Sequence, residues 1–380
     1  MIYITTMQSP TYRQITLEEL LFQTYIPGNN LLHANTTNTK TITRETLSKT
    51  FKQSFNINSL IAKLEAFNGS VSALRETARA ELYSTFHIPK RSGGLRRIDA
   101  PKPELMDALR ALKTLFETEF NALYHTSAFA YVKGRNTVSA IKRHQKNESK
   151  WFGKYDLSDF FGSTTLEFVL QQLGMVFPFC EVIKDATGAN ELSKALELAF
   201  LNGSLPQGTP ISPLITNLMM IPIDFRLSNG LRDFNSQSYV YTRYADDFIV
   251  SSKYHFNARE IENWIAGVLA EFNAPFTIKE EKTRYGSSSG RNWNLGVMLN
   301  KNNEITVGHK RKRQFQSMLH NYIRDKQNGI RWDIHDIQVM NGLRSYYNMV
   351  EPTVFTNIIK HINEKKGVNV ERLIKNDLRL

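Results

Sequence analysis

The chain has 380 residues, with 48 basic and 36 acidic side chains, a formal net charge of +12, and 41% hydrophobic residues. This length predicts two or three subdomains of ordinary globular composition rather than one small core. The positive charge favours a polyanionic partner, nucleic acid before membrane. The single cysteine, Cys180, excludes an intramolecular disulfide and a cysteine-rich zinc site.

Targeting and membrane segments are not predicted. The first residues lack a basic region followed by a long apolar stretch, so we expect no signal peptide. No stretch approaches 18 consecutive apolar residues, so we expect no transmembrane helix and no membrane partner. These features predict a cytoplasmic protein.

The first 87 residues predict a mostly helical extension. Residues 17–22 have a short helical pattern, residues 30–43 are polar and loop-like, and apolar residues recur at helical spacing over 58–82. A packing role is the simpler interpretation of this extension, with accessory RNA binding as the alternative.

Residues 88–101 predict a β-hairpin with Gly93 and Gly94 at its turn. Basic side chains stand on both arms and can converge near the tip: Lys90, Arg91, Arg96 and Arg97. Such a hairpin suits phosphate binding, because arginine offers a bidentate fork. The alternative is a solvated hairpin whose charged edge prevents aggregation.

Basic residues continue into the next segments. A helix is expected over 104–120, and a glycine-bearing loop over 131–138 carries Lys133 and Arg135. A second helix over 140–146 could present cations to a nucleic-acid backbone or only to solvent.

A strand is predicted over 151–157, with Asp156 near its end. Thr164 or Thr165 is expected to cap a helix that runs to residue 173. A further helix is expected over 191–201.

The segment 205–217 combines a tight turn at Gln207-Gly208 with a helix start. Ser212 is expected as the cap and Pro213 in the first turn of a buried helix. A turn followed by a helix N-terminus is a natural contact for a nucleotide or template base. It is also an ordinary way for a loop to enter a helix.

Residues 239–251 give the strongest signal: two strand-like runs flank a short polar turn at Asp246-Asp247. Adjacent like charges repel each other unless a cation lies between them. Carboxylate oxygens are the ligands that Mg²⁺ prefers. An ordinary surface turn is the alternative if this string is taken by itself.

The last third of the chain is predicted to contain a helix and several strands up to residue 307, and mainly helices after it. An amphipathic helix is expected over 257–272, a strand over 276–278 leads to a charged turn at Lys282, and two strands over 294–299 and 304–307 form a hairpin. Residues 309–380 are predicted to be helical and basic.

Taken in chain order, these segments resemble the reverse transcriptases, most closely the bacterial branch of retron, group II intron and defence-associated enzymes. The matching pieces are 88–101, 129–137, Tyr155-Asp156-Leu157-Ser158-Asp159-Phe160-Phe161, 205–213, Tyr244-Ala245-Asp246-Asp247, Lys282-Thr283 and Leu295-Gly296.

The resemblance implies an α+β right-hand polymerase with fingers, a palm of antiparallel sheet plus helices, and a helical thumb. The implied domains are an N-terminal extension at 1–87, fingers and palm at 88–308, and a basic thumb at 309–380. The implied enzyme is an RNA-directed DNA polymerase that uses dNTPs and two Mg²⁺ ions per active site, for which Mn²⁺ can substitute.

The resemblance also implies residue roles, with Lys282 as general acid to the pyrophosphate leaving group and Phe161 as a steric gate against ribonucleotides. The implied catalytic residues are Asp156, Asp246, Asp247 and Lys282. The implied metal ligands are Asp156, the Leu157 carbonyl, Asp246 and Asp247. The implied dNTP contacts are Lys90, Arg96, Leu157, Phe161, Gln207 and Gly208. The implied nucleic-acid contacts are Lys133, Arg135, Lys310, Arg311, Lys312 and Arg313.

Departures from the family pattern narrow the expected role. His144 follows Ser139-Ala140 one residue later than in the retron-type string, and Asn294-Leu295-Gly296 replaces Val-Thr-Gly. We therefore expect a stand-alone enzyme that copies a dedicated noncoding RNA in antiviral defence. The alternatives are a retron enzyme that makes RNA-linked DNA and a catalytically idle RNA-binding scaffold. The sequence leaves open what the primer is, whether a companion defence protein is needed, and whether the protein forms a homo-oligomer.

Overall fold

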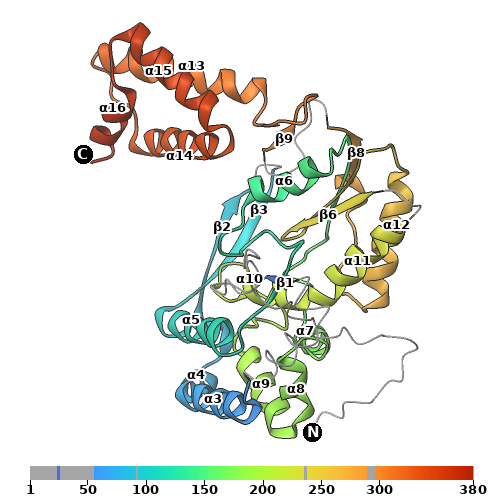
Figure 1. Ribbon diagram of the computed structural model, residues 1–380. Helices are drawn as coiled ribbons and strands as arrows, with labels where there is room; N and C mark the ends of the chain where they lie inside the picture. The colour runs from blue at the N-terminus through green and yellow to red at the C-terminus, as the bar shows by residue number, and fades with distance from the viewer. Residues whose placement is uncertain (1–23, 26–54, 91–92, 235–237, 289–295, 380) are drawn as a thin grey trace, which may run out of the picture. The chain divides into compact units, whose positions relative to one another are not determined.

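The computed structural model describes residues 24–25, 55–90, 93–234, 238–288 and 296–379 (Figure 1). The predictions at 17–22 and 30–43 lie outside these residues. The chain divides into two compact units that interleave along the sequence. The first draws on Met1–Lys133, Asp156–Gly230 and Glu260–Lys279, and the second on Gly134–Tyr155, Leu231–Arg259 and Glu280–Leu380. Helices and antiparallel sheets occur together, as expected for the α+β class.

In the first unit, several helices pack around α3. Asn56 caps α3 by accepting a hydrogen bond from the Ser59 amide, and the apolar face of α3 is buried. This face packs against α8 and α9, as Figure 1 shows. The approach of α3 to α9 is close, because a Cβ at Gly188 would lie 3.0 Å from the Ile61 side chain. The helices and short helical turns of this region are α3 Ile57–Ser70, α4 Ser72–Glu76, η2 Arg79–Leu82, α5 Pro103–Thr118, α7 Leu166–Leu173, α8 Phe179–Lys184, α9 Ala186–Glu197, α10 Ser212–Met219, α11 Ile221–Asp233 and α12 Ala258–Glu271.

Two short antiparallel sheets also belong to the first unit. β2 Tyr83–Pro89 pairs with β3 Leu95–Pro101, which confirms the predicted basic hairpin. β1 Thr24–Tyr25 pairs with β4 Tyr124–His125.

Three local predictions need correction. The helix expected over 191–201 is α9, which starts earlier because the Asp185 side chain caps it by accepting from the Gly188 amide. Ser212 is not a cap: it lies inside α10, and the Thr209 hydroxyl accepts from the Ser212 amide at 3.1 Å. The strand expected over 276–278 is reduced to a single bridge between Leu157 and Ile278.

The second unit contains a four-stranded antiparallel sheet in the order β6-β7-β5-β8. These strands are β6 Tyr239–Tyr244, β7 Asp247–Ser252, β5 Trp151–Asp156 and β8 Arg284–Ser287. β6 and β7 form the predicted hairpin, and β5 ends at Asp156 as predicted. β8 was not anticipated, because its short run is not strongly apolar.

The remaining elements of the second unit are mostly helical. α6 Thr137–Lys146 precedes β5, and β9 Met298–Leu299 pairs with β10 Ile305–Thr306. The C-terminal helices are α13 His309–Gln327, α14 Ile334–Val350, α15 Pro352–Lys366 and α16 Val370–Asp377. α14 contacts α13, α15 and α16 (Figure 1), around buried Phe315, Tyr347 and Phe355. This confirms the predicted helical C-terminal region. Across the described residues, no helix has both the length and the apolar character needed to cross a bilayer.

Candidate active site

The Asp246-Asp247 turn is held by the pairing of its two strands. Tyr244 lies opposite Asp247, which leaves Ala245 and Asp246 as a two-residue turn. Ala245 has a φ of +57°, a left-handed conformation that a residue with a Cβ adopts at some cost. Arg243 is completely buried in β6, and its guanidinium donates a hydrogen bond to the Ala245 carbonyl at 3.4 Å. Strand pairing and a buried guanidinium therefore both hold this turn.

The strand β5 lies between β7 and β8 in the same sheet. Its Lys154 ammonium lies 2.6 Å from the Asp247 carboxylate, with side chains 23% and 15% exposed. Asp156 follows two residues later at the end of β5 and is 8% exposed. Because side chains alternate along a strand, Lys154 and Asp156 share a face of the sheet.

Tyr244, at the end of β6, is held in its neutral form. Burial raises its pKa, and the nearby Tyr346 of α14 raises the pKa further. The Tyr244 hydroxyl therefore stays protonated near neutral pH.

The chain beyond β5 is fixed by backbone pairing within the first unit. The Lys279 amide donates to the Asp156 carbonyl at 2.8 Å, and the Ser158 amide donates to the Thr277 carbonyl at 2.7 Å. Leu157 is 1% exposed. Among the following aromatic residues, Phe161 is only partly buried.

The β2–β3 hairpin distributes its basic residues over two faces. Ile88 pairs with Arg96, so Lys90 and Arg96 lie on one face, and both are exposed. Arg97 lies on the other face, where its guanidinium Nε lies 2.9 Å from the Asp99 carboxylate. The structure therefore places together the two cations that the resemblance assigns to the triphosphate. Arg91 lies outside the described residues.

The Gln207-Gly208 turn packs directly on β3. The Asp99 amide donates to the Gln207 carbonyl at 2.9 Å. Gly208 has a φ of +124°, and a Cβ there would lie 2.9 Å from the Asp99 carbonyl oxygen and the Ile98 side chain. Glycine is therefore required both by backbone conformation and by space. The structure brings Gln207 and Gly208 to the strand that carries Arg96.

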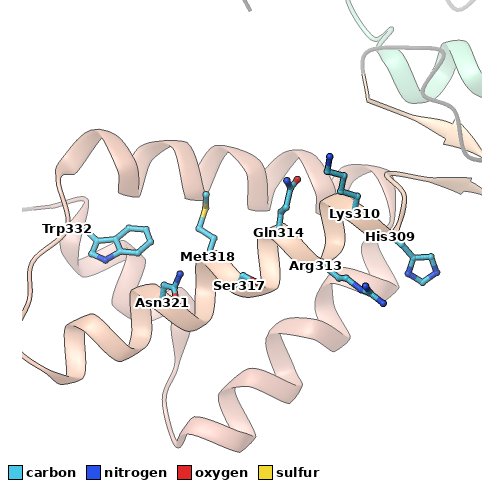
Figure 2. Close-up of a pocket in the computed structure, with 8 residues that line it drawn as sticks. All are labelled: His309, Lys310, Arg313, Gln314, Ser317, Met318, Asn321 and Trp332. Atoms are coloured by element: carbon cyan, nitrogen blue, oxygen red, sulfur yellow. The ribbon is translucent and has the colours of Figure 1, made fainter.

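The four basic residues at the start of α13 do not face the same way. Arg311 donates to the Gly296 carbonyl at 2.7 Å, and Lys312 lies 2.6 Å from the Glu351 carboxylate. Lys310 and Arg313 are exposed and line a groove along α13, which Figure 2 shows. The other residues that line this groove are His309, Gln314, Ser317, Met318, Asn321 and Trp332.

The remaining predicted site residues are basic. Lys133 is exposed and Arg135 is partly buried in the loop before α6, and Lys282 is exposed in the short helical turn η3, Glu280–Lys282.

Two residues of this region were missed in the sequence. Arg243 lies among apolar strand residues, and Lys154 lies two positions before Asp156, a spacing that places both on one face of a strand. That period-two spacing was the available signal. Over the described residues, no three or more histidine, cysteine, aspartate or glutamate side chains gather as a metal-binding group.

The sheet, the carboxylate turn and the basic hairpin are features of a template-directed polymerase. The family model described as Reverse transcriptase (RNA-dependent DNA polymerase) matches residues 88–329, and the chain belongs to this family. The protein is therefore an RNA-directed DNA polymerase with the right-hand fold of that class.

Its relatives include several bacterial reverse transcriptases. The chain is 26% identical to the Retron Ec83 reverse transcriptase of Escherichia coli, over 80% of this chain and 92% of that protein. It is 28% identical to the Retron Ec73 reverse transcriptase of Escherichia coli, over 74% and 87% respectively. It is also 28% identical to the Retron Mx65 reverse transcriptase of Myxococcus xanthus, over 73% and 64%.

Proposed function

We propose that the protein synthesises DNA on an RNA template, using the carboxylates of Asp156, Asp246 and Asp247. The position of Asp247 beside the end of β5, given by its ion pair with Lys154, carries the proposal. Asp156 ends this strand, and Asp246 forms the adjoining turn.

The donor set fits a hard divalent cation. Asp156, the Leu157 carbonyl and Asp246 offer oxygen ligands, which suit Mg²⁺ and also Mn²⁺. Asp247 adds a further carboxylate. Two bound Mg²⁺ ions would lower the pKa of the primer 3′-hydroxyl and stabilise the attacking and leaving oxygens.

The other residues of the chain bind and orient the substrates. Arg96 and Lys90 bind the triphosphate from one face of the hairpin. The exposure of both side chains on that face supports this role. Gln207 and Gly208 line the incoming nucleotide and template base. Lys282 donates a proton to the pyrophosphate leaving group.

Two assigned contacts concern the sugar and the nucleic-acid strands. Phe161 lies beneath the sugar of the nucleotide and excludes a 2′-hydroxyl. Lys133, Arg135, Lys310 and Arg313 contact the template and primer backbones.

The template is a dedicated noncoding RNA, and the enzyme serves antiviral defence, alone, with a companion protein or as a homo-oligomer. The retron alternative gains support from the relatives, since the three compared above are all named retron reverse transcriptases. The segments 139–144 and 294–296 depart from the retron-type sequence pattern and favour the non-retron proposal. Residues 294 and 295 lie outside the described structure.

The first test is to purify the protein from its native host and sequence the bound RNA and DNA. A discrete RNA with DNA complementary to one segment of it supports the proposal. RNA joined covalently to that DNA supports the retron alternative instead. RNA without DNA, together with no primer extension in dNTPs and Mg²⁺, would support an idle scaffold.

The Asp246→Asn variant tests the catalytic assignment directly. We expect its primer extension to fall by at least about 100-fold, because an amide cannot supply the negative charge that holds a divalent cation. Extension is measured on an annealed RNA template and DNA primer. Glu364→Gln, which changes an exposed acid on α15, is the matched control and should keep full activity. Equal activity in the two variants would refute the assignment.

A further inference from the structure

The groove along α13 has two ends of different chemical character. His309, Lys310 and Arg313 line one end, and Trp332 lies at the other, as Figure 2 shows. Within the described part of the chain, no aspartate or glutamate is among the side chains that line the groove. Its volume of about 680 Å³ is within the range of about 300–1,000 Å³ that is typical of ligand sites. The groove therefore combines a cationic end, which suits an anion, with an aromatic end.

Neutral polar side chains lie between the two ends. Gln314, Ser317 and Asn321 are exposed and follow one another along α13 at spacings of three and four residues, so they form one row. With a rise of about 1.5 Å per residue, His309 and Asn321 lie about 18 Å apart along the helix axis. Hydroxyl and amide groups can bond to the 2′-hydroxyls of RNA as well as to phosphates. This row and its length suit a chain of several nucleotides better than a small anion.

The indole ring of Trp332 is held by its neighbours in the second unit. Its Nε1 donates a hydrogen bond to the Asp325 carboxylate at 3.0 Å, and the ring packs edge-on against Tyr322 with 5.4 Å between centroids. Tyr322 is 1% exposed, and its hydroxyl donates to the Asp377 carboxylate at 2.7 Å. The one donor of the indole is therefore used, and the part of Trp332 that lines the groove presents only aromatic surface. Met318 also lines the groove and adds apolar surface.

We propose that the groove along α13 binds a single-stranded segment of RNA, with one unpaired base stacked on Trp332 and the backbone phosphates on Lys310 and Arg313. A stacking surface selects an unpaired base, because the bases inside a duplex already stack on their neighbours. The row of hydroxyl and amide groups favours RNA over DNA, since only RNA carries a 2′-hydroxyl. This inference rests on the proposed function, which assigns Lys310 and Arg313 to nucleic-acid binding.

The experiment measures the fluorescence anisotropy of labelled probes with the full-length protein at several KCl concentrations. The probes are a single-stranded RNA, the same RNA annealed to its complement, and a single-stranded DNA of the same sequence. The variants are Trp332→Ala, Trp332→Phe and Lys310→Ala/Arg313→Ala. Tyr254→Ala is the matched control, because it removes an aromatic side chain that is 61% exposed and follows β7. Thermal melting verifies that each variant is folded.

Photochemical cross-linking locates the stacked base in the wild-type protein, so it does not depend on the folding of a variant. The single-stranded RNA is made with 5-iodouridine in place of uridine and irradiated in the complex. Mass spectrometry of the digested protein then identifies the cross-linked residue. We expect a cross-link at Trp332 with the single strand and none there with the duplex.

We expect Trp332→Ala to bind the single-stranded RNA at least about fivefold more weakly than the wild type, and the duplex within about twofold of it. The slope of log affinity against log salt should not change in this variant, because the indole neutralises no phosphate, whereas Lys310→Ala/Arg313→Ala should lower the slope. Trp332→Phe keeps an aromatic ring and should lose less than about threefold. Tyr254→Ala should bind like the wild type. Single-stranded DNA should bind the wild type at least about threefold more weakly than the RNA.

The contrary outcomes separate this inference from the proposed function. If Trp332→Ala and Tyr254→Ala bind the single-stranded RNA equally, or if no cross-link forms at Trp332, no base stacks there. If Trp332→Ala weakens the binding of the single strand and the duplex alike, Trp332 only supports the packing of this region. Equal affinity for RNA and DNA would overturn RNA as the occupant. The contacts assigned to Lys310 and Arg313 would stand in these cases, and they are wrong only if Lys310→Ala/Arg313→Ala binds RNA like the wild type.

Discussion

Phe160 and Phe161 are neighbours in sequence but occupy different environments. Phe160 is 3% exposed and packs edge-on against Phe276 at 5.1 Å between ring centroids, whereas Phe161 is only partly buried. Phe160 is therefore a core residue. Phe161 keeps an accessible edge, which a steric gate requires.

Replacing Phe161 by alanine should raise the incorporation of ribonucleotides relative to deoxyribonucleotides by at least about tenfold. The reason is that the smaller side chain leaves room for the 2′-hydroxyl that the ring would contact. The ratio of kcat/KM for one rNTP and its matching dNTP measures this effect. Phe161→Tyr, which keeps the ring, should retain discrimination. An unchanged ratio in the alanine variant would show that Phe161 is not the gate.

His144 is a buried histidine in the second unit. Its Nδ1 lies 2.6 Å from the Ser251 hydroxyl and its Nε2 lies 2.8 Å from the Thr242 hydroxyl, so both ring nitrogens have partners. Burial, with a smaller contribution from Arg143, lowers the pKa of His144 from 6.5 to about 3. The ring therefore remains neutral in the folded protein at physiological pH and joins α6 to β6 and β7.

The lowered pKa of His144 predicts that the folded protein becomes less stable in acid. Because the folded pKa is lower than the unfolded pKa, the unfolded chain takes up a proton first, and stability falls as the pH drops from about 6.5 toward 3. Between pH 7 and pH 5 the loss should be on the order of 1–2 kcal/mol. Urea unfolding at both pH values measures it. His144→Gln should lose less stability over this interval than the wild type, and an equal loss would contradict the assignment.

At the scale of elements, the β2–β3 hairpin sorts its cations by strand register. Lys90 and Arg96 lie together on one exposed face, and Arg97 lies on the opposite face beside Asp99. The sequence predicted that the basic residues converge near the tip of this hairpin, but the strand register places them on two separate faces. Arg97 pairs with a carboxylate on its own face, and the opposite face, with Lys90 and Arg96, is the one assigned to the triphosphate.

Arg96→Ala should therefore raise the KM for dNTPs by about tenfold, because it removes a charge-assisted contact to phosphate. Arg97→Ala is the matched control: it removes the same side chain from the next residue but from the other face. We expect Arg97→Ala to change the KM by less than about twofold. Steady-state extension with varied dNTP concentration distinguishes them. Equal effects of both variants would refute the assignment by face.

The basic residues at the start of α13 also point in different directions, here because side chains are distributed around a helix. Arg311 and Lys312 contact Gly296 and Glu351, so they stabilise the packing of the second unit. Lys310 and Arg313 are three residues apart, are exposed, and line the groove instead. The two outward residues remain the proposed nucleic-acid contacts.

At the scale of the whole molecule, the charge of +12 predicts RNA binding that weakens with salt. Lys310→Ala/Arg313→Ala should reduce the slope of log affinity against log salt by about 1.5, since each lost phosphate contact removes about 0.7–0.9. Fluorescence anisotropy with labelled RNA at several KCl concentrations measures the slope. Lys360→Ala/Lys365→Ala, with the same charge loss on α15, should leave the slope near that of the wild type. Equal slopes in the two double variants would contradict a specific role for α13.

Local patterns in the sequence were sufficient for most elements of this fold. The strand-like runs on both sides of Asp246-Asp247 predicted the β6–β7 hairpin, and the apolar spacing over residues 58–82 predicted α3 and its following turns. The order of these motifs also predicted the family, which the family match confirms. These features could be predicted because periodicity and turn chemistry depend on residues close together in the chain.

Contacts between distant segments were decided only by the tertiary structure. The pairing of Lys154 with Asp247, the packing of Gly208 on β3, and the inward direction of Arg311 and Lys312 join residues that local patterns do not relate. A charge in a sequence has no direction until strand register or helix packing gives it one. The sequence by itself determined which charges and carboxylates this polymerase carries. The tertiary structure decided which of them neutralise one another and which remain exposed.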